Sequence, residues 1–466
     1  MHVDMHMLWT SDGGFRKVDY QSLIGGSQMS NLSYVIVTLL CQVLSSVPIG
    51  TKRCLFTLLW ALMSGRFLAS RGAVIPALAA MGLADDEVRR SEAALAYGRY
   101  RTMDLVSAWH KMVYEQGHFR RHSHEGIHPV AGDLTGFFRL RLCDCTTKHF
   151  STQAGKSLPA LVFGLCVEVG SVGAMRLGLP RLVLRLQPGE TELDLQRRLV
   201  KEAAINLAKD EALVLDAGFP LSDLRSLENV GFVVRMALNA SARKNELPPY
   251  CGKGTHPKWG VLVRPLPRTY GKNKVPATEP DATARWNDKG YQIKAYIYDN
   301  LVAANEKPGG VSYRLIVIVD PRYNKPLLLA TNLSVSACAV WNLYKDRWPV
   351  EQLPLAAKQM LGTERSFVSG QEARYRLPEL ALIGGNCLSY MAATAPAVPT
   401  GFWDRRSRPT CGRLRRHLER LHFSELPLPE DQLRKKASIT DHLPKGVLAH
   451  RRQKTDRRPI EPALAA

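Results

Sequence analysis

The sequence predicts an α/β protein in which a mixed sheet is flanked by helices, preceded by an all-α region and interrupted by a β-rich insertion. Residues 1–125 contain long runs with apolar side chains at helical spacing. Residues 126–238 change to short strands followed by helix–strand alternation, and residues 239–311 are rich in Pro, Gly, Lys and Asn. The sheet is expected to resume over 312–395, and residues 396–466 form a basic C-terminal region.

The N-terminal region is expected to be helical from residue 31 onward. A run of leucines at helical spacing lies in 50–67, and residues 71–101 are predicted to form two helices separated near Gly82. Asp85 is a candidate N-cap for the second of these helices. Short helices joined by a Gly-containing turn and flanked by arginines are compatible with a helix-turn-helix DNA reader, although any helical bundle with a solvated basic face has the same pattern.

The predicted sheet begins with three short strands that are rich in Leu or β-branched residues and end at Gly, Ser or Pro. These strands are 128–142, 159–171 and 181–186. A helix, a strand, a second helix and a second strand follow, at 190–208, 211–219, 221–230 and 231–238. Consecutive strands followed by helix–strand alternation are typical of a mixed sheet with helices on its faces.

The insertion contains two strand-like segments, at 261–266 and 291–302. After it, strands are predicted at 312–321 and 325–333, and helices at 344–362 and 376–393. Beyond residue 400 the chain has 16 Lys and Arg against 8 Asp and Glu, so this end is expected to present a basic surface.

Composition narrows the class of protein. The chain has 63 Lys and Arg against 42 Asp and Glu, a formal net charge of +21, and 45% hydrophobic residues. The hydrophobic content excludes a disordered chain, and the charge favours a polyanionic partner, most often nucleic acid, over ribosomal packing or solubility alone. The nine cysteines include no CxxC pair, which favours free thiols in a reducing compartment.

No segment has the pattern of a membrane span or a signal peptide. The most apolar window, residues 31–46, is interrupted by Ser, Thr and Gln, and is too short and too polar to cross a bilayer. A buried helix is expected there instead. The first residues lack the basic and apolar parts of a secretory signal.

One polar set interrupts the apolar stretch 344–362. Tyr344, Arg347, Glu351 and Lys358 lie at offsets of 0, 3, 7 and 14, so on a regular α-helix they would share a stripe roughly 60° wide. Two prolines, Pro349 and Pro354, lie inside this stretch. The helix is therefore expected to begin near Pro349, a favourable first residue, and to bend at Pro354, which has no N–H to donate.

Two carboxylates on predicted strands complete a possible metal site. Asp133 lies in "VAGDLTG" and Asp216 in "LVLDAGF", both in apolar surroundings where an unpaired charge is costly to bury. Either residue alone could be a turn or helix-capping Asp. Together with Glu351 they would offer three carboxylates to one or two Mg²⁺ ions, which prefer oxygen ligands and can support in-line phosphoryl transfer.

The spacing Tyr344-x2-Arg347-x3-Glu351-x6-Lys358 resembles the Y-R-E-K signature of bacterial insertion-sequence DDE transposases of the insertion-sequence-four type. "Asp216-Ala-Gly-Phe" is similar to the Asp-x-Gly-aromatic motif of that family, and Asp133 followed by Thr two residues later resembles its first Asp motif. The resemblance covers roughly residues 50–395. It implies an RNase H-like core with a β-rich insertion between the second Asp and the Glu.

The resemblance also implies a function. Asp133, Asp216 and Glu351 would be the catalytic, metal-binding triad for Mg²⁺ or Mn²⁺, with two ions, and Tyr344, Arg347 and Lys358 would contact the DNA end. The expected activity is cleavage at the terminal inverted repeats of a mobile element, followed by strand transfer into target double-stranded DNA. A homodimer assembled on DNA, in the nucleoid of the bacterial cytoplasm, is the expected form, with no membrane association.

Several alternatives remain open. Asp144, just after a strand, could replace Asp133, and Asp320 in "LIVIVDP" has the pattern of the second Asp but is followed by turn residues. A catalytically inactive, transposase-derived repressor and a plain nuclease of the same fold are the alternative functions. The His-rich segment 118–128 could bind metal, but its irregular spacing favours a solvated loop.

Two tryptophans lie in the insertion. Relatives that excise through a DNA hairpin often hold a flipped base on a Trp of this region, and Trp286 is the candidate. Trp286 precedes "NDKG" and is expected on an exposed loop or strand end, although it could instead anchor the insertion to the core. Trp259 leads directly into a strand and is expected to be packed.

Overall fold

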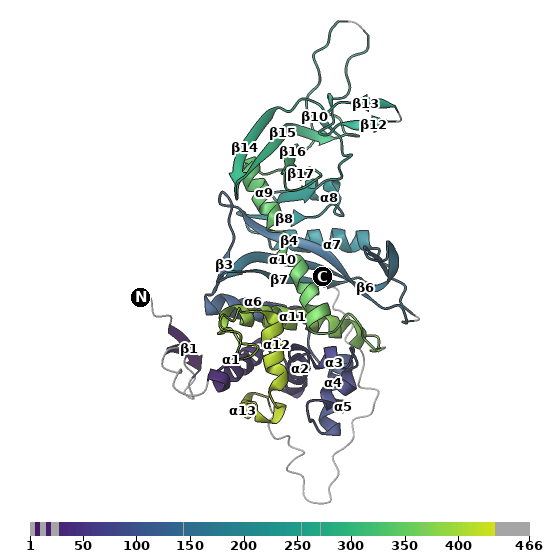
Figure 1. Ribbon diagram of the computed structural model, residues 1–466. Helices are drawn as coiled ribbons and strands as arrows, with labels where there is room; N and C mark the ends of the chain where they lie inside the picture. Colours follow the sequence, from purple (N-terminus) through teal and green to yellow (C-terminus); the bar gives the residue numbers. More distant parts are fainter. Residues whose placement is uncertain are drawn as a thin grey trace, which may run out of the picture.

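The computed structural model describes residues 5–9, 15–19 and 28–433, apart from residues 143, 253, 271 and 369. A bundle of helices lies at one end of the elongated molecule, a large sheet crosses its middle, and the β-rich insertion forms the other end (Figure 1). Of the basic region predicted at 396–466, residues 434–466 lie outside the described part of the chain. A short antiparallel hairpin, β1 (Met5–Trp9) and β2 (Phe15–Asp19), precedes the bundle.

The N-terminal region is helical between residues 28 and 116, as predicted, but the all-α region predicted over 1–125 is wrong for the β1–β2 hairpin and for a short strand at Phe119–Arg121. Its helices are α1 (Gln28–Val43), α2 (Ile49–Met63), α3 (Arg66–Ala69), α4 (Val74–Ala79), α5 (Asp85–Tyr97) and α6 (Thr102–Gln116). Asp85 is the first residue of α5 rather than its N-cap, which is Ala84. Ile36 and Leu40 of α1 are fully buried, so the apolar window at 31–46 is a core helix as expected.

The central part of the sheet is built around β4. On one side β4 (His128–Phe138) pairs antiparallel with β6 (Lys156–Val172), which pairs antiparallel with β7 (Met175–Arg185). On its other side β4 pairs parallel with β8 (Glu211–Leu215), which pairs parallel with β9 (Gly231–Arg235). The predicted mixed sheet is therefore confirmed. Two short strands along β6, β3 (Phe119–Arg121) and β5 (Lys148–Ser151), were not predicted.

Helices cover both faces of this sheet. Successive side chains of a strand point to opposite faces, and Leu213 and Leu215 of β8 pack with α7 (Glu192–Ile205) and α8 (Leu221–Arg225). Val214 of the same strand packs on the other face, against α9 (Ala337–Lys345). That other face, further along the sheet, packs against α10 (Pro349–Leu355), α11 (Ala373–Thr394) and the N-terminal bundle.

The insertion extends the same sheet. β9 pairs with β17 (Leu327–Thr331), β17 with β16 (Tyr313–Val319), and β16 with β15 (Tyr291–Ala303), all antiparallel. β14 (Ala282–Asp288) and β10 (Ala242–Lys244) then pair with β15, and β11 (Leu262–Val263) pairs with β10. The result is a 13-stranded sheet, beside which β12 (Arg268–Tyr270) and β13 (Asn273–Val275) form a separate hairpin.

The stretch 344–362 is not one regular helix, so the single stripe predicted for its four polar residues is wrong. α9 ends at Lys345, α10 begins at Pro349 as its first residue, and a π-helical turn, η1 (Ala356–Met360), follows Pro354. The missing N–H of Pro354 explains the irregular turn, because the backbone ladder cannot continue normally past it. The predicted start at Pro349 and the disruption at Pro354 are both confirmed.

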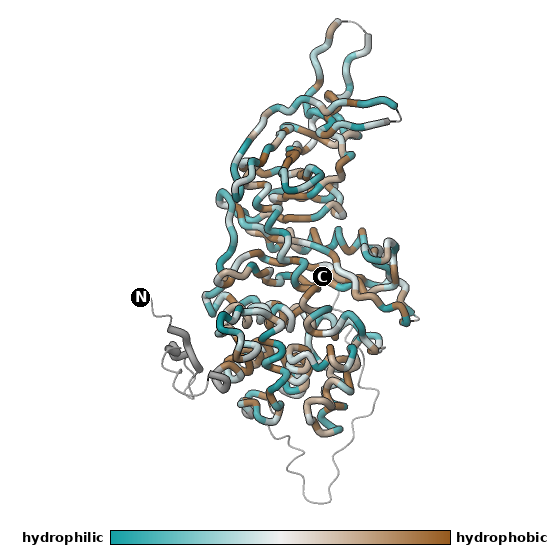
Figure 2. The backbone as a smooth tube through the Cα atoms, viewed as in Figure 1, coloured by the Kyte–Doolittle hydropathy of each residue, from teal (hydrophilic) through white to brown (hydrophobic). Residues whose placement is uncertain are grey.

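The remaining helices are α12 (Cys411–Arg420), a 3₁₀ turn η2 (Phe423–Glu425) and α13 (Glu430–Leu433), and α12 packs against α11. Hydrophobic segments follow the sheet and the bundle interior, while hydrophilic ones follow the outer loops (Figure 2). Within the described residues, none of the helices combines the length and the apolar character that crossing a bilayer requires.

Candidate active site

The register of the two central parallel strands brings the two aspartates together. Gly132 of β4 is paired with Leu215 of β8, so the residues that follow them, Asp133 and Asp216, are neighbours. Both side chains point to the face covered by α9 and α10, because Leu215 points to the opposite face, into the core beneath α7. Glu351 reaches the same place from the first turn of α10.

Arg347 and Tyr344 connect these carboxylates. The Arg347 guanidinium donates to Asp133 across 3.1 Å (Nη1 to Oδ2) and forms a second ion pair with Glu351. The Tyr344 hydroxyl donates to Asp216 Oδ1 across 3.1 Å. The three predicted carboxylates and two of the predicted DNA contacts thus converge on one place. They come from β4, the end of β8, the helices α9 and α10, and the segment between these helices.

Lys358, in η1, contacts a residue further along β4. Its Nζ donates to the hydroxyl of Thr135 across 3.0 Å, and Thr135 is two residues after Asp133 on the same face of the strand. Burial lowers the pKa of Lys358 to about 8, with the nearby carboxylates of Glu364 and Asp133 opposing that shift. The lysine therefore remains mostly protonated at neutral pH and supplies a positive charge beside the carboxylates.

The three carboxylates repel one another. Burial raises the pKa of Asp133, and the like charges of Glu351 and Asp216 raise it further, against the lowering effect of Arg347 and the Leu134 N–H. Although burial disfavours its charged form, these carboxylates hold the pKa of Arg347 above its ordinary range. The site is therefore one in which added positive charge is favourable.

The donor set fits Mg²⁺ or Mn²⁺ by its chemistry, since Asp133, Asp216 and Glu351 are hard oxygen ligands that repel one another. As they stand, however, the Arg347 guanidinium lies between Asp133 and Glu351. In the described part of the chain, no group of three or more His, Cys, Asp or Glu side chains is arranged closely enough to hold a metal ion. A metal ion could bind between these carboxylates only if the Arg347 side chain moved away from them.

The alternative aspartates lie elsewhere. Asp144 is in the turn after β4, where it forms an ion pair with Arg374 across 2.5 Å. Asp320 follows β16 and accepts hydrogen bonds from the backbone N–H and the guanidinium of Arg322. Each of these carboxylates is therefore paired with its own arginine, and Asp133 is the residue beside Asp216.

The two tryptophans differ from expectation. Trp286 lies within β14 rather than on a loop, is half-buried, and packs against Trp341 of α9 with ring centroids 5.5 Å apart. Its indole N–H is buried and, among the described residues, has no partner. Trp259 is not packed as expected, because 41% of its surface is exposed and the Arg243 guanidinium lies 5.2 Å from the centre of its ring. The position of Trp286 suits an anchor between the insertion and α9.

Sequence reasoning missed Arg235 and Asp346. Arg235, at the end of β9, lies 3.4 Å from Asp216 and is half exposed. Asp346 is buried between α9 and α10 and accepts hydrogen bonds from His122 (2.9 Å) and His124 (2.8 Å). The prediction of a solvated histidine loop at 118–128 is therefore wrong for these two histidines.

Asp346 is held ionised by its partners. Burial alone would raise its pKa, but the hydrogen bonds and charges of His122 and His124 lower it to about 2. The only sequence signal was an Asp directly before Arg347, in a segment where most other residues are apolar. This buried pairing fixes the end of α9, and with it the backbone that leads into Arg347.

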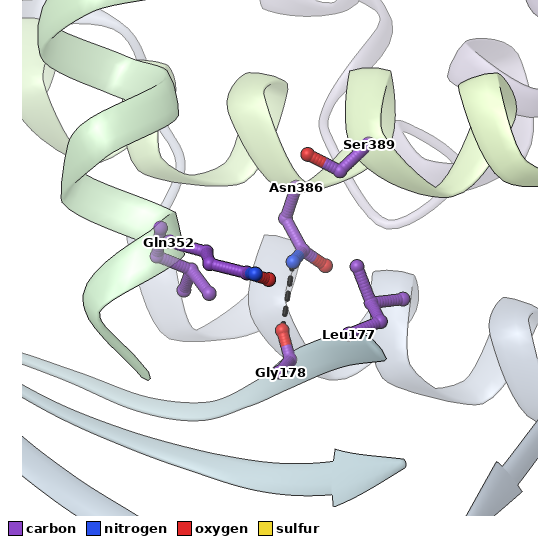
Figure 3. A pocket seen from close by; sticks show the side chains of 6 residues that line it. Leu177, Gly178, Gln352, Asn386 and Ser389 are labelled. Atoms are coloured by element: carbon purple, nitrogen blue, oxygen red, sulfur yellow. Dashed lines mark hydrogen bonds between the residues drawn. The ribbon is translucent and has the colours of Figure 1, made fainter. Parts of the chain in front are cut away.

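A small polar hollow lies on the other side of α10. Leu177, Gly178, Gln352, Leu353, Asn386 and Ser389 line it (Figure 3). Asn386 donates to the Gly178 carbonyl across 2.7 Å and accepts from the Trp109 indole N–H across 2.7 Å. A Cβ on Gly178 would lie only 2.9 Å from the Pro349 carbonyl oxygen, so this glycine allows the start of α10 to approach β7. The backbone of α10, and hence Glu351, depends on that approach.

Compared with models of known protein families and with curated proteins, the chain matches none of them.

Proposed function

We propose that the protein is a DDE transposase with an RNase H-like core. It would cleave the ends of a mobile DNA element and join them to target DNA. The observation that carries this proposal is the convergence around Arg347: the guanidinium binds Asp133 and Glu351, while Tyr344, three residues earlier, binds Asp216. These are the Tyr, Arg and Glu of the Y-R-E-K signature and the aspartates of the two Asp motifs.

The strand order supports the proposed core. Across its central part the sheet runs β7-β6-β4-β8-β9, with antiparallel pairing on the β6 side of β4 and parallel pairing on the β8 side. An RNase H-like core has this arrangement, with its first aspartate on the central strand. The second aspartate follows the neighbouring parallel strand, and the glutamate comes from a later helix. Asp133, Asp216 and Glu351 hold these three positions.

The chemistry would be hydrolysis of a phosphodiester at the element end, followed by attack of the freed 3′-hydroxyl on target DNA. Asp133, Asp216 and Glu351 would hold two Mg²⁺ or Mn²⁺ ions, which stabilise the attacking and leaving oxygens of such in-line displacements. Arg347 is poised to exchange its carboxylate partners for a DNA phosphate, because a guanidinium binds both groups with the same paired geometry. Lys358 would add a second phosphate contact.

The net charge of +21 suits DNA as the partner. The proposal includes terminal inverted repeats and target DNA as substrates, a homodimer assembled on the DNA, and a place in the bacterial nucleoid. The helical N-terminal region and the basic C-terminal region would add DNA contacts. For Trp286, a role in holding a flipped base stays a prediction, while its packing on Trp341 favours anchoring.

The proposal can be tested with the full-length protein and a plasmid that carries this reading frame with its native flanking DNA. In Mg²⁺, the wild type should cut at the element ends and produce joined products. Glu351→Gln should lower cleavage at least about 100-fold while DNA binding persists, because the exchange removes an anionic ligand and retains the shape of the side chain. The matched control is Glu228→Gln, because Glu228 is an exposed carboxylate in the turn that follows α8.

The possible outcomes separate the alternative functions. Undiminished cleavage by Glu351→Gln would remove this triad from the mechanism. Binding of the flanking DNA without any cleavage by the wild type would favour a transposase-derived repressor. Cleavage that never yields joined products would favour a plain nuclease.

A further inference from the structure

A second cationic site lies in the C-terminal region, on α12. Four α12 residues, at spacings of three, four and seven, share one face of the helix, and the segment 398–400 covers that face. Together they enclose a small hollow that is partly open to solvent. It is lined by Val398, Pro399, Thr400, Arg413, Arg416, His417 and Arg420. No part of the proposed catalytic machinery contributes to this hollow.

The positive charge of the hollow is only partly compensated. Arg413 forms an ion pair with Asp404 across 2.7 Å, and Asp404 also accepts the N–H and the hydroxyl of Thr400 at 3.1 and 3.2 Å. Arg416 and Arg420 are exposed, and in the described ranges neither forms an ion pair. Three guanidinium groups on one helix face repel one another, so an anion between them would lower the energy.

His417 provides a second, independent observation. Its side chain is 95% buried, since only 5% of its surface is exposed, and its Nε2 has no hydrogen-bond partner within the described ranges. Burial and the neighbouring Arg420 lower its pKa, so the imidazole is mainly neutral at pH 7. A buried nitrogen without a partner is costly, and native proteins rarely leave one unless a ligand or water satisfies it.

We propose that this hollow binds a phosphate group of the DNA backbone, as a second DNA contact apart from the carboxylates. Arginines bind phosphate oxygens in pairs, and the unpartnered Nε2 of His417 offers a further donor. That the phosphate belongs to DNA rests on the proposed function. It is also favoured by the adjoining surface, where Phe402 and Trp403 are 95% and 68% exposed and Arg405, Arg406 and Arg408 follow. Such a surface suits a long polyanion better than a free ion.

The test measures binding of the full-length protein to a 20-base-pair duplex of unrelated sequence, as a function of salt. Arg416→Ala/Arg420→Ala should weaken binding about ten-fold and lower the salt slope by about one unit, the value for one lost phosphate contact. Lys201→Ala/Lys209→Ala removes the same charge from exposed positions on α7 and in the turn that follows it, which do not line the hollow. This control should change affinity much less. Equal slopes for both double variants would overturn the proposal.

The His417 resonance distinguishes the source of the phosphate. In a protein with labelled histidines, the duplex should shift the His417 signal and raise its pKa, and His417→Gln identifies that signal by its loss. Inorganic phosphate at the same phosphate concentration should give a smaller shift. A larger response to inorganic phosphate, or none to the duplex, would overturn the assignment to DNA. Since Arg416 and Arg420 are exposed, their variants keep the test decisive even if His417→Gln fails to fold.

The two proposals fail separately. Glu351→Gln should leave the response of His417 to the duplex unchanged, because Glu351 lies on α10 and does not line the hollow. Loss of cleavage in Glu351→Gln with no effect of the Arg416/Arg420 change would refute the phosphate hollow alone. The opposite pattern would refute the triad alone.

Discussion

Two clusters of charged side chains lie at opposite ends of β8 and differ in how their charges are paired. At the start of the strand, Glu211 and Glu168 of β6 are both buried and share two arginines, Arg121 of β3 and Arg181 of β7. At the other end, Asp133, Asp216 and Glu351 surround Arg347, with the half-exposed Arg235 beside Asp216. The first cluster pairs each carboxylate with both arginines, whereas in the second Arg347 pairs with Asp133 and Glu351, and Arg235 pairs with Asp216.

The pKa shifts follow this difference. Burial would raise the pKa of Glu168, but hydrogen bonds from His110 and Tyr114 and the charges of Arg181 and Arg121 lower it to about 2. For Asp133, burial and the neighbouring carboxylates outweigh the lowering effect of Arg347 and the Leu134 N–H, so the pKa is raised. The first cluster, with mutually paired charges, joins strands and helix α6, whereas in the second cluster like charges still oppose ionisation of Asp133.

The largest contrast is expected in folding stability. Glu168→Gln should lower the free energy of unfolding by about 3–5 kcal/mol, because Arg121 and Arg181 each lose one of their two carboxylate partners. Glu351→Gln should change it by less than about 1 kcal/mol, since Arg347 retains Asp133. Urea unfolding of both variants measures the difference. Equal losses would show that the two clusters serve the same structural role.

The dependence on pH sharpens the contrast. The pKa of Glu168 falls from an ordinary value of 4.5 to about 2 in the fold, so its contribution is fully present above pH 4.5 and is lost as pH falls through 2. That contribution is about 3 kcal/mol, and roughly half should remain at pH 3. Urea unfolding of wild type and Glu168→Gln at pH 5 and pH 3 should show the gap narrowing. A gap that stays constant would mean that Glu168 is not held ionised.

The smallest expected effect concerns position rather than charge. Gly178→Ala should push the Pro349 carbonyl, costing about 1–3 kcal/mol of stability and lowering cleavage about ten-fold as Glu351 is displaced. Gly50→Ala is the control, because nothing lies within 4 Å of the Cβ it would add. Normal cleavage by Gly178→Ala would show that α10 can shift without harm to the site.

Local patterns made much of the fold predictable. Short apolar runs and helical spacing located β4, β6, β8 and α7, and Pro349 marked the start of α10. Asp133 and Asp216 could be chosen because each interrupts an apolar strand. Their proximity then follows from the parallel register, which the sequence does not state.

Other features depend on partners far apart in the chain. Asp346 meets His122 and His124 more than 200 residues away, and Trp286 meets Trp341, and neither pairing leaves a local pattern. Arg235 is a single polar residue at the end of an apolar strand, so nothing in the local sequence marked it as a neighbour of Asp216. Side-chain pairing across the sheet, rather than local propensity, determined each of these outcomes.

The continuous ladder from β9 through β17 and β16 to β15 makes the insertion inseparable from the core. Amide hydrogens of β15 and β16 should therefore exchange as slowly as those of β9, because opening one strand exposes the next. A truncated chain lacking β15 and β16 would expose the edge of β17 and favour self-association. Shortening is tolerable only outside that ladder, as in the separate β12–β13 hairpin.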